Sequence, residues 1–263
     1  MGTQDSATTR LDHYIAHMLP WAHGHQRKAI RDFVRAILDR QTGCQAQLAR
    51  NFGKQEAAVK RLSRLLHNER LEPRHLADAV LLQALVQLPA HGPVRLAIDW
   101  TTEGHQHLLV VSLIMGRRAV PIYWRAYDAT VLKGRMQRYA LAVVRRAVTW
   151  VSQKAGRRRV RVTADRGFAD VALFTLLTDV RVAFVIRVKK STKIGIAGGW
   201  RPLDTLRFAG NTRRRRWGHL LYGARNPQPL WVTMSRKRDQ HGKWGLWYLV
   251  ANWPYTAAQA VAE

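Results

Sequence analysis

The sequence predicts an α/β protein that begins with helices, continues as a mixed sheet with covering helices, and ends in a β-rich segment. Three observations support this prediction. Apolar residues recur at spacings of three and four over residues 1–90, which is typical of amphipathic helices. Short β-branched runs alternate with helical patterns over 91–190, and strand patterns rich in Gly, Trp and Arg fill 191–254. We therefore expect a helical domain, a sheet core and an all-β insertion or subdomain.

The first part is expected to contain several amphipathic helices. Residues 27–38 place their apolar side chains on one face, and 76–88 form a further helix after Pro73. Between them, 45–52 and 56–66 are predicted to be two helices separated by Gly53. A helix, a glycine-containing turn and a second helix outline a helix-turn-helix.

Three cations lie on the outer side of the second helix of this pair: Lys60, Arg61 and Arg64. Side chains of this kind suit contacts with DNA phosphates, so we expect this domain to bind DNA. The alternative is an ordinary helical hairpin with a basic, solvated face.

The hydrophobic period changes after residues 91–93, where His-Gly-Pro interrupts the chain. We expect three strands, then a helix, a strand, a helix and a strand. In that order the elements span 94–100, 107–115, 118–127, 134–154, 157–164, 169–178 and 180–188. This is the element order of the ribonuclease-H-like fold, in which the first and fourth strands are neighbours.

Two aspartates lie at the ends of those two strands. Asp99 closes the apolar run of the first, and Asp165 directly follows the fourth. If the strands are neighbours, the two carboxylates share one pocket. Hard oxygen ligands suit Mg²⁺ or Mn²⁺, and a pair of such ions can assist cleavage of a phosphodiester.

The two aspartates also have simpler interpretations, since each can be a polar strand end or the partner of a nearby Arg. This two-metal chemistry usually needs a third acid. If the chain is an unrelated metal-dependent nuclease, Asp170 or Glu103 is the candidate for that acid.

The charge balance favours a polyanionic partner. The chain carries 44 Lys and Arg against 17 Asp and Glu, a formal net charge of +27. Nucleic acid is the expected partner and an anionic membrane the rival, although no stretch is long and apolar enough to span a bilayer. The densest charge is Arg213, Arg214, Arg215 and Arg216, followed by Trp217. This run is either a solvated loop or a phosphate-contacting arm with an aromatic side chain that stacks on a base.

A single cysteine, Cys44, excludes an internal disulfide and a cysteine-based zinc site. The N-terminus has no signal-peptide pattern. A cytoplasmic location is therefore expected.

The sequence resembles the DDE insertion-sequence transposases of the IS-four family. The block Leu96-Ala97-Ile98-Asp99-Trp100-Thr101 is similar to the strand with the family's first aspartate, and Thr163-Ala164-Asp165-Arg166-Gly167-Phe168 to the block with its second. The resemblance implies a Mg²⁺-dependent cut-and-paste enzyme that acts as a homodimer on transposon ends. It also implies that Asp99 and Asp165 are catalytic metal ligands and that 191–254 is the family's β-rich insertion.

One part of the family pattern is not matched. The third acid of the family lies in Tyr-x₂-Arg-x₃-Glu-x₆-Lys, and residues 255–263 stop where the helix with this signature begins. We therefore expect a truncated transposase that binds DNA without cutting it efficiently. The alternative is a non-catalytic DNA-binding remnant or an inhibitor of a full-length transposase.

Overall fold

The structure is a computed structural model of the chain, and it describes residues 2–206, 213–238 and 242–255. The chain forms two compact units, Met1–Gln83 and Ala84–Glu263. Each unit has its own packing.

The first unit is helical. Its helices are α1 (Gly2–Met18), α2 (Gly24–Arg40), α3 (Gln45–Ala49), α4 (Gln55–Leu66) and most of α5 (Pro73–Val86). The helices expected at 27–38, 45–52, 56–66 and 76–88 are present with shifted ends. α1 was not individually predicted, because its first two turns are polar and rich in Thr and Ser, so they lack an apolar stripe.

Two small cores hold these helices together. Ala36 of α2 packs with Leu48 and Ala49 of α3 and with Ala58 and Leu62 of α4. The turn between α3 and α4 passes through Gly53, whose φ of 87° is readily adopted only by glycine. The predicted helix, turn and helix therefore exist as a packed group on α2.

A second core joins the ends of α1 and α2 to α5. Its buried residues are Ile15, Leu19 and Ala22, and Leu76 and Ala79 pack against them. The side chain of Arg31 also bonds to Asp12 and Asp32, which ties α2 to α1.

The second unit is built on a mixed sheet. Its first strands are β1 (Val94–Glu103), β2 (Gln106–Met115) and β3 (Arg118–Asp128), which are antiparallel neighbours. The strand β4 (Val160–Ala164) pairs with β1 in parallel, and β5 (Ala183–Val188) pairs with β4 in parallel. The expectation that the first and fourth strands lie side by side is confirmed.

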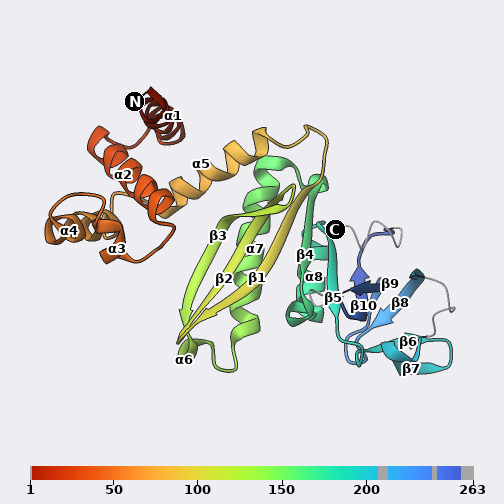
Figure 1. The fold of residues 1–263 in the computed structure, drawn as a ribbon. Coiled ribbons are helices and arrows are strands. Elements are labelled where there is room, and N and C mark those ends of the chain that lie inside the picture. Colours follow the sequence, from red (N-terminus) through yellow and green to blue (C-terminus); the bar gives the residue numbers. More distant parts are fainter. Residues whose placement is uncertain (1, 207–212, 239–241, 256–263) are drawn as a thin grey trace. The chain divides into compact units, whose positions relative to one another are not determined.

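The β-rich segment continues the same sheet. It contains β6 (Lys193–Ile196), β7 (Gly199–Pro202), β8 (Arg214–Tyr222), β9 (Gln228–Arg238) and β10 (Trp244–Ala251). The last of these pairs antiparallel with β5, so the described strands have the order β3-β2-β1-β4-β5-β10-β9-β8-β6-β7. The described strands of this segment thus join the preceding strands through the pairing of β10 with β5 (Figure 1).

Helices α7 (Met136–Ala155) and α8 (Val171–Asp179) pack on one face of this sheet. Trp150 of α7 contacts Tyr123, and Phe174 of α8 stacks on Phe184 with ring centroids 5.1 Å apart. Beneath them, strand side chains that are fully buried or nearly so form the core: Val94, Leu96, Ile98, Val111, Leu113, Val160, Val162, Phe184 and Ile186. We call this the helix-covered face.

The alternate residues of the same strands point to the other face, because successive strand side chains point to opposite sides. Ala97, Thr163 and Ala183 there are only half-buried, and Asp99 is exposed. We call this side the open face and define it by Ala97, Asp99, Thr163, Asp165, Arg187 and Trp247. The sheet therefore presents the two aspartates on the side opposite α7 and α8.

Candidate nucleic-acid and metal site

The strand register brings Asp99 and Asp165 together. The parallel pairing of β1 and β4 ends at Ile98 opposite Ala164, so Asp99 and Asp165 occupy the next position on each chain. Asp165 keeps an extended backbone (φ −77°, ψ 178°), which continues the direction of β4 for one residue. Neighbouring strands lie about 4.8 Å apart, and paired residues point to the same face. The two carboxylates are therefore adjacent on the open face.

The backbone of the following turn fixes the Asp165 carboxylate. Its Oδ1 accepts a hydrogen bond of 2.8 Å from the backbone N–H of Gly167, at the start of a short 3-10 helix (Arg166–Phe168). A Cβ on residue 167 would lie only 3.0 Å from that same oxygen. Phe168 is buried and anchors the turn in the core. The hydrogen bond, the lack of a Cβ and the buried ring thus explain why Gly167 and Phe168 follow Asp165 in the Asp-Arg-Gly-Phe sequence.

The strand next to Asp165 supplies a cation. The parallel pairing of β4 and β5 ends at Ala164 opposite Ile186, which places Arg187 beside Asp165. Burial lowers the pKa of the Arg187 guanidinium most, Arg166 lowers it further, and Asp165 opposes the shift. Arg187 stays charged at neutral pH because the pKa of a guanidinium lies far above neutrality. A phosphate near the two aspartates would meet this charge.

The other acids that the sequence suggested are in different settings. The Asp170 carboxylate accepts a 2.7 Å hydrogen bond from the Ala172 N–H and caps the N-terminus of α8. Glu103 is at the far end of β1, paired with Gln106, four residues beyond Asp99. Two strand repeats, each of two residues and about 6.7 Å long, separate Glu103 from the aspartate pair. Across the described ranges, no group of three or more His, Cys, Asp or Glu side chains could hold a metal ion.

The Arg213–Arg216 run is mostly a strand rather than a loop. Arg214 to Arg216 open β8, whose residues alternate between the two faces. Arg216 lies over the Trp231 ring at 4.7 Å and donates a 2.7 Å hydrogen bond to the carbonyl of Tyr255. Arg215 lies over Trp217 at 5.0 Å. Trp217 therefore contacts its own chain, and the four arginines do not form one uniform arm.

Sequence reasoning missed the aromatic and cationic group beside Arg187. The guanidinium of Arg187 lies 4.4 Å from the centre of the Trp247 ring, and Lys237 Nζ lies 4.9 Å from it. Burial lowers the pKa of Lys237, and Arg214 adds to that effect. No local motif marks these residues, since they are far apart in the sequence and meet only through the order of β5, β10 and β9.

In the first unit, the three predicted DNA-binding cations are exposed on α4 but differ in their contacts. Arg61 lies over the Phe52 ring at 4.8 Å and is 4.0 Å from an Asp32 oxygen. Arg64 donates a 3.3 Å hydrogen bond to the carbonyl of Lys60 one turn earlier. Lys60 and Arg64 thus project along one side of α4, while Arg61 is directed towards α2.

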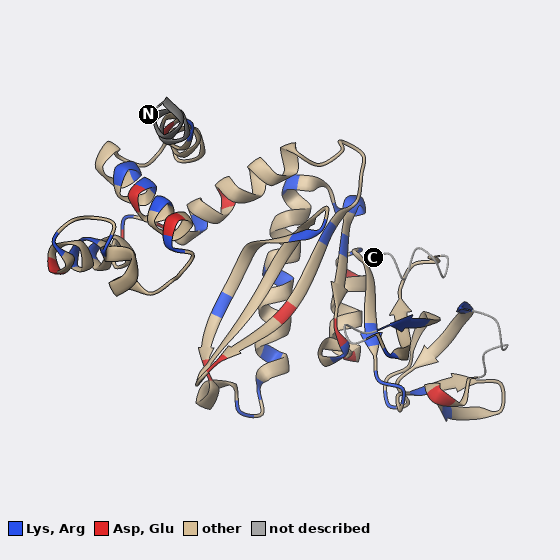
Figure 2. Cartoon of the chain, in the orientation of Figure 1, with Lys and Arg blue, Asp and Glu red and all other residues tan. Residues whose placement is uncertain are grey.

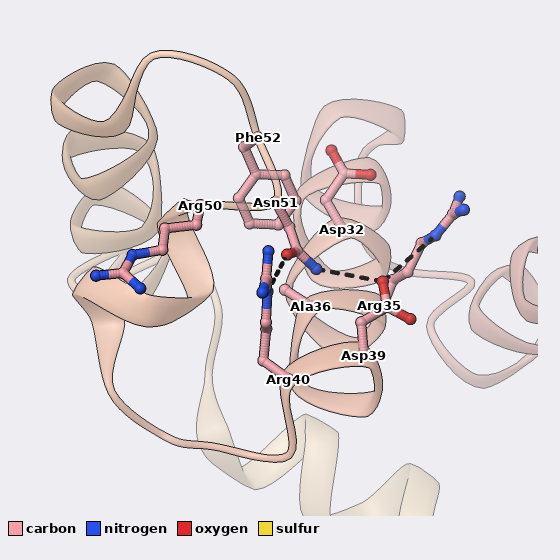
Figure 3. Close-up of a pocket in the computed structure, with 8 residues that line it drawn as sticks. All are labelled: Asp32, Arg35, Ala36, Asp39, Arg40, Arg50, Asn51 and Phe52. Atoms are coloured by element: carbon pink, nitrogen blue, oxygen red, sulfur yellow. Dashed lines mark hydrogen bonds and ion pairs between the residues drawn. The ribbon is translucent and has the colours of Figure 1, made fainter.

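A shallow groove lies between α2 and the turn that joins α3 to α4. Arg40 bonds to Asn51, Asn51 bonds to Asp39, and Arg35 is 4.0 Å from Asp39, so these side chains form a connected row (Figure 3). Arg50 extends away from this row on the α3 side. The groove carries both signs of charge, and its polar groups bond chiefly to one another.

Comparison with known proteins gives matches among solved structures only. No family model matches the chain, and no curated protein matches it. Among solved structures 34 chains match, including an Argonaute from Marinitoga piezophila in complex with a 5′ OH guide RNA. That match has 9% sequence identity and a TM-score of 0.35, and it covers 84% of this chain. This chain spans about a third (34%) of that protein, and so loose a superposition has no bearing on function.

Lys and Arg outnumber Asp and Glu by 13 to 8 in the first unit and by 31 to 9 in the second, so most of the excess positive charge lies in the second unit (Figure 2). The described helices include none that is long and apolar enough to cross a bilayer. Residues 207–212 and 256–263, including the segment where a C-terminal helix was expected to start, lie outside the described residues.

Proposed function

We propose that this protein binds DNA and holds a divalent metal ion between Asp99 and Asp165 on a ribonuclease-H-like core, as a transposase of the DDE type. One observation carries the proposal. The β1–β4 register puts the two aspartates at neighbouring positions on the open face of the sheet. The excess of 44 Lys and Arg over 17 Asp and Glu supports a polyanionic substrate.

The residues fit Mg²⁺ or Mn²⁺ in a specific way. Mg²⁺ commonly binds one or two carboxylates and completes its octahedron with waters and substrate phosphate oxygens. Asp99 and Asp165 would provide the carboxylates, and the DNA backbone would provide the phosphate. A metal in this position would polarise the phosphodiester and lower the pKa of a bound water.

The protein groups around the pair have separate tasks. The Gly167 N–H holds one oxygen of Asp165, which leaves the other oxygen available as a ligand. Arg187 offers positive charge to the phosphate on the side of β5. In the helical unit, Lys60 and Arg64 contact DNA phosphates. Action on transposon ends as a homodimer belongs to the same proposal.

A second candidate function is DNA binding without efficient cleavage, as a remnant or an inhibitor of a complete transposase. The role of Asp170 favours it over the unrelated nuclease, because this acid, which the nuclease would need as a metal ligand, already caps α8.

The proposal is tested by metal binding and by cleavage. We expect purified protein to bind Mn²⁺, measured by electron paramagnetic resonance, and Asp99→Asn or Asp165→Asn to weaken binding at least tenfold. Glu103→Gln is the matched control and should leave Mn²⁺ affinity unchanged. Equal affinity in all four proteins would disprove the metal site.

Incubation with supercoiled plasmid and Mg²⁺ or Mn²⁺ separates the two candidates. Nicking that Asp99→Asn abolishes supports the transposase. DNA binding in a gel-shift assay without nicking supports the second candidate. Binding to anionic liposomes that DNA does not compete away would contradict both.

A further inference from the structure

The open face carries a row of cations that begins at the aspartate pair and crosses the sheet. Register places Arg187 beside Asp165, and the next strand, β10, lies antiparallel to β5 with Leu249 opposite Arg187. Trp247 lies two residues from Leu249 and points to the same face. Lys237 on β9 pairs with Gly245, which lies two residues before Trp247, so Lys237 also points to this face. The row thus runs over β4, β5, β10 and β9 in their order in the sheet.

Trp247 orients the cations on both sides of it. Since β5 and β9 flank β10, Arg187 and Lys237 approach the indole from opposite neighbouring strands, at 4.4 and 4.9 Å from its centre. Both cations lie against the indole, which therefore serves as a contact for them. Its rigid ring restricts the conformations of two long side chains.

Neighbouring charges make these cations suited to an anion. Burial lowers the pKa of both groups. Arg166 lowers the pKa of Arg187 further while Asp165 opposes that shift, and Arg214 lowers the pKa of Lys237 further. In the part of the chain that the structure describes, no carboxylate lies within 4.0 Å of the Arg187 guanidinium. A phosphate here relieves repulsion between cations and compensates for the part of their hydration that is lost on partial burial.

We propose that Arg187 and Lys237, held by Trp247, contact successive backbone phosphates of the DNA strand that enters the Asp99–Asp165 pair. The inference rests on the proposed function and names the surface that guides the strand. Arg187 is the contact next to the metal position, and Lys237 is the contact further along the sheet. Trp247 is a positioning residue.

The test is the salt dependence of binding to a 30-base-pair duplex without divalent metal. Each phosphate contact contributes about −0.9 to the slope of log affinity against log salt concentration. We expect Arg187→Gln and Lys237→Gln each to reduce the slope by about 0.9, and the double variant by about twice that. Trp247→Leu should approach the double variant, and Trp247→Phe should restore part of the loss.

Arg146→Gln is the matched control, because this exposed arginine lies on α7, which packs on the helix-covered face. Its slope should equal that of the unmodified protein. Thermal melting of each variant checks folding. If Trp247→Leu unfolds, the two Gln variants still test the proposal, since both change only partly buried side chains.

A second measurement locates the DNA. Cys44 is the single cysteine. In a Cys44→Ser background, a cysteine introduced at position 187 or at position 146 therefore carries one photo-crosslinker. We expect adducts with DNA from residue 187 and few from residue 146. Unmodified protein that binds without salt dependence would overturn the proposed function itself. Salt-dependent binding in which the Arg187 and Lys237 variants behave like the Arg146 variant would overturn only this inference.

Discussion

The Asp165 carboxylate is positioned by the second and third residues after it. Gly167 donates its N–H to Oδ1 and has no Cβ to displace that oxygen, while buried Phe168 anchors the turn. The identity of residue 167 therefore bears on the geometry of the proposed metal site, although its own side chain touches no metal.

Replacing this glycine tests that dependence. Gly167→Ala introduces a Cβ 3.0 Å from Asp165 Oδ1, so the carboxylate must move. We expect Mn²⁺ affinity to fall about tenfold, as for other changes to groups that orient a metal ligand, with little change in melting temperature. Gly218→Ala is the control, because nothing lies within 4 Å of its added Cβ. Equal Mn²⁺ affinity in the two variants would show that Asp165 needs no such support.

The cations of α4 are expected to separate into two roles. Arg61 contacts Phe52 and Asp32, whereas Lys60 and Arg64 point along the helix surface. Arg61→Gln should lower the free energy of unfolding by roughly 0.5–1 kcal/mol, the range of an exposed cation–π contact. Lys60→Gln and Arg64→Gln should weaken DNA binding and leave stability unchanged. Urea unfolding and gel-shift titration measure the two effects. The reverse pattern would place the DNA on the α2 side of α4.

At the scale of elements, helix α8 shows why a nearby acid need not be a metal ligand. Its N-terminal N–H groups need acceptors, and Asp170 provides one at 2.7 Å from the Ala172 nitrogen. The spacing of five residues from Asp165 gave no means of distinguishing a cap from a ligand. The dihedral angles and hydrogen bond distinguish them.

Asp170→Ala should therefore affect stability and not metal binding. We expect a loss of about 1 kcal/mol, measured by urea unfolding, since the cap is removed. Asp170→Asn retains an acceptor oxygen and should recover most of that loss. A large fall in Mn²⁺ affinity for Asp170→Asn, in a stably folded protein, would favour the nuclease alternative.

At the scale of the whole molecule, the net charge of +27 governs the association with DNA. Phosphate contacts release counterions, so affinity falls steeply with salt. If 6–10 phosphates are contacted, raising salt from 50 to 200 mM should weaken binding by roughly 10³–10⁵-fold. Fluorescence anisotropy with a labelled duplex measures this. Affinity that is insensitive to salt would contradict a phosphate-dominated interface.

The sequence alone determined which segments become helices and strands where the apolar pattern was strong. It located α2, α4, α7 and β1 to β5 approximately, because period 3.6 and β-branched runs are local signals. It missed β6 and β7, which are short and contain Gly, and it left most of β8 unassigned because charges fill its first half. It also selected Asp99 and Asp165, whose strands are indeed neighbours.

Only the tertiary structure decided what surrounds that pair. Arg187 and Trp247 are sixty positions apart, and they meet because β10 returns to pair with β5. The alternation of β8 likewise sends Arg214 and Arg216 to one face and Arg215 to the other, which no count of consecutive arginines reveals. The physical reason is that hydrophobic periodicity is encoded within a strand, whereas the order of strands depends on pairing between distant segments of the chain.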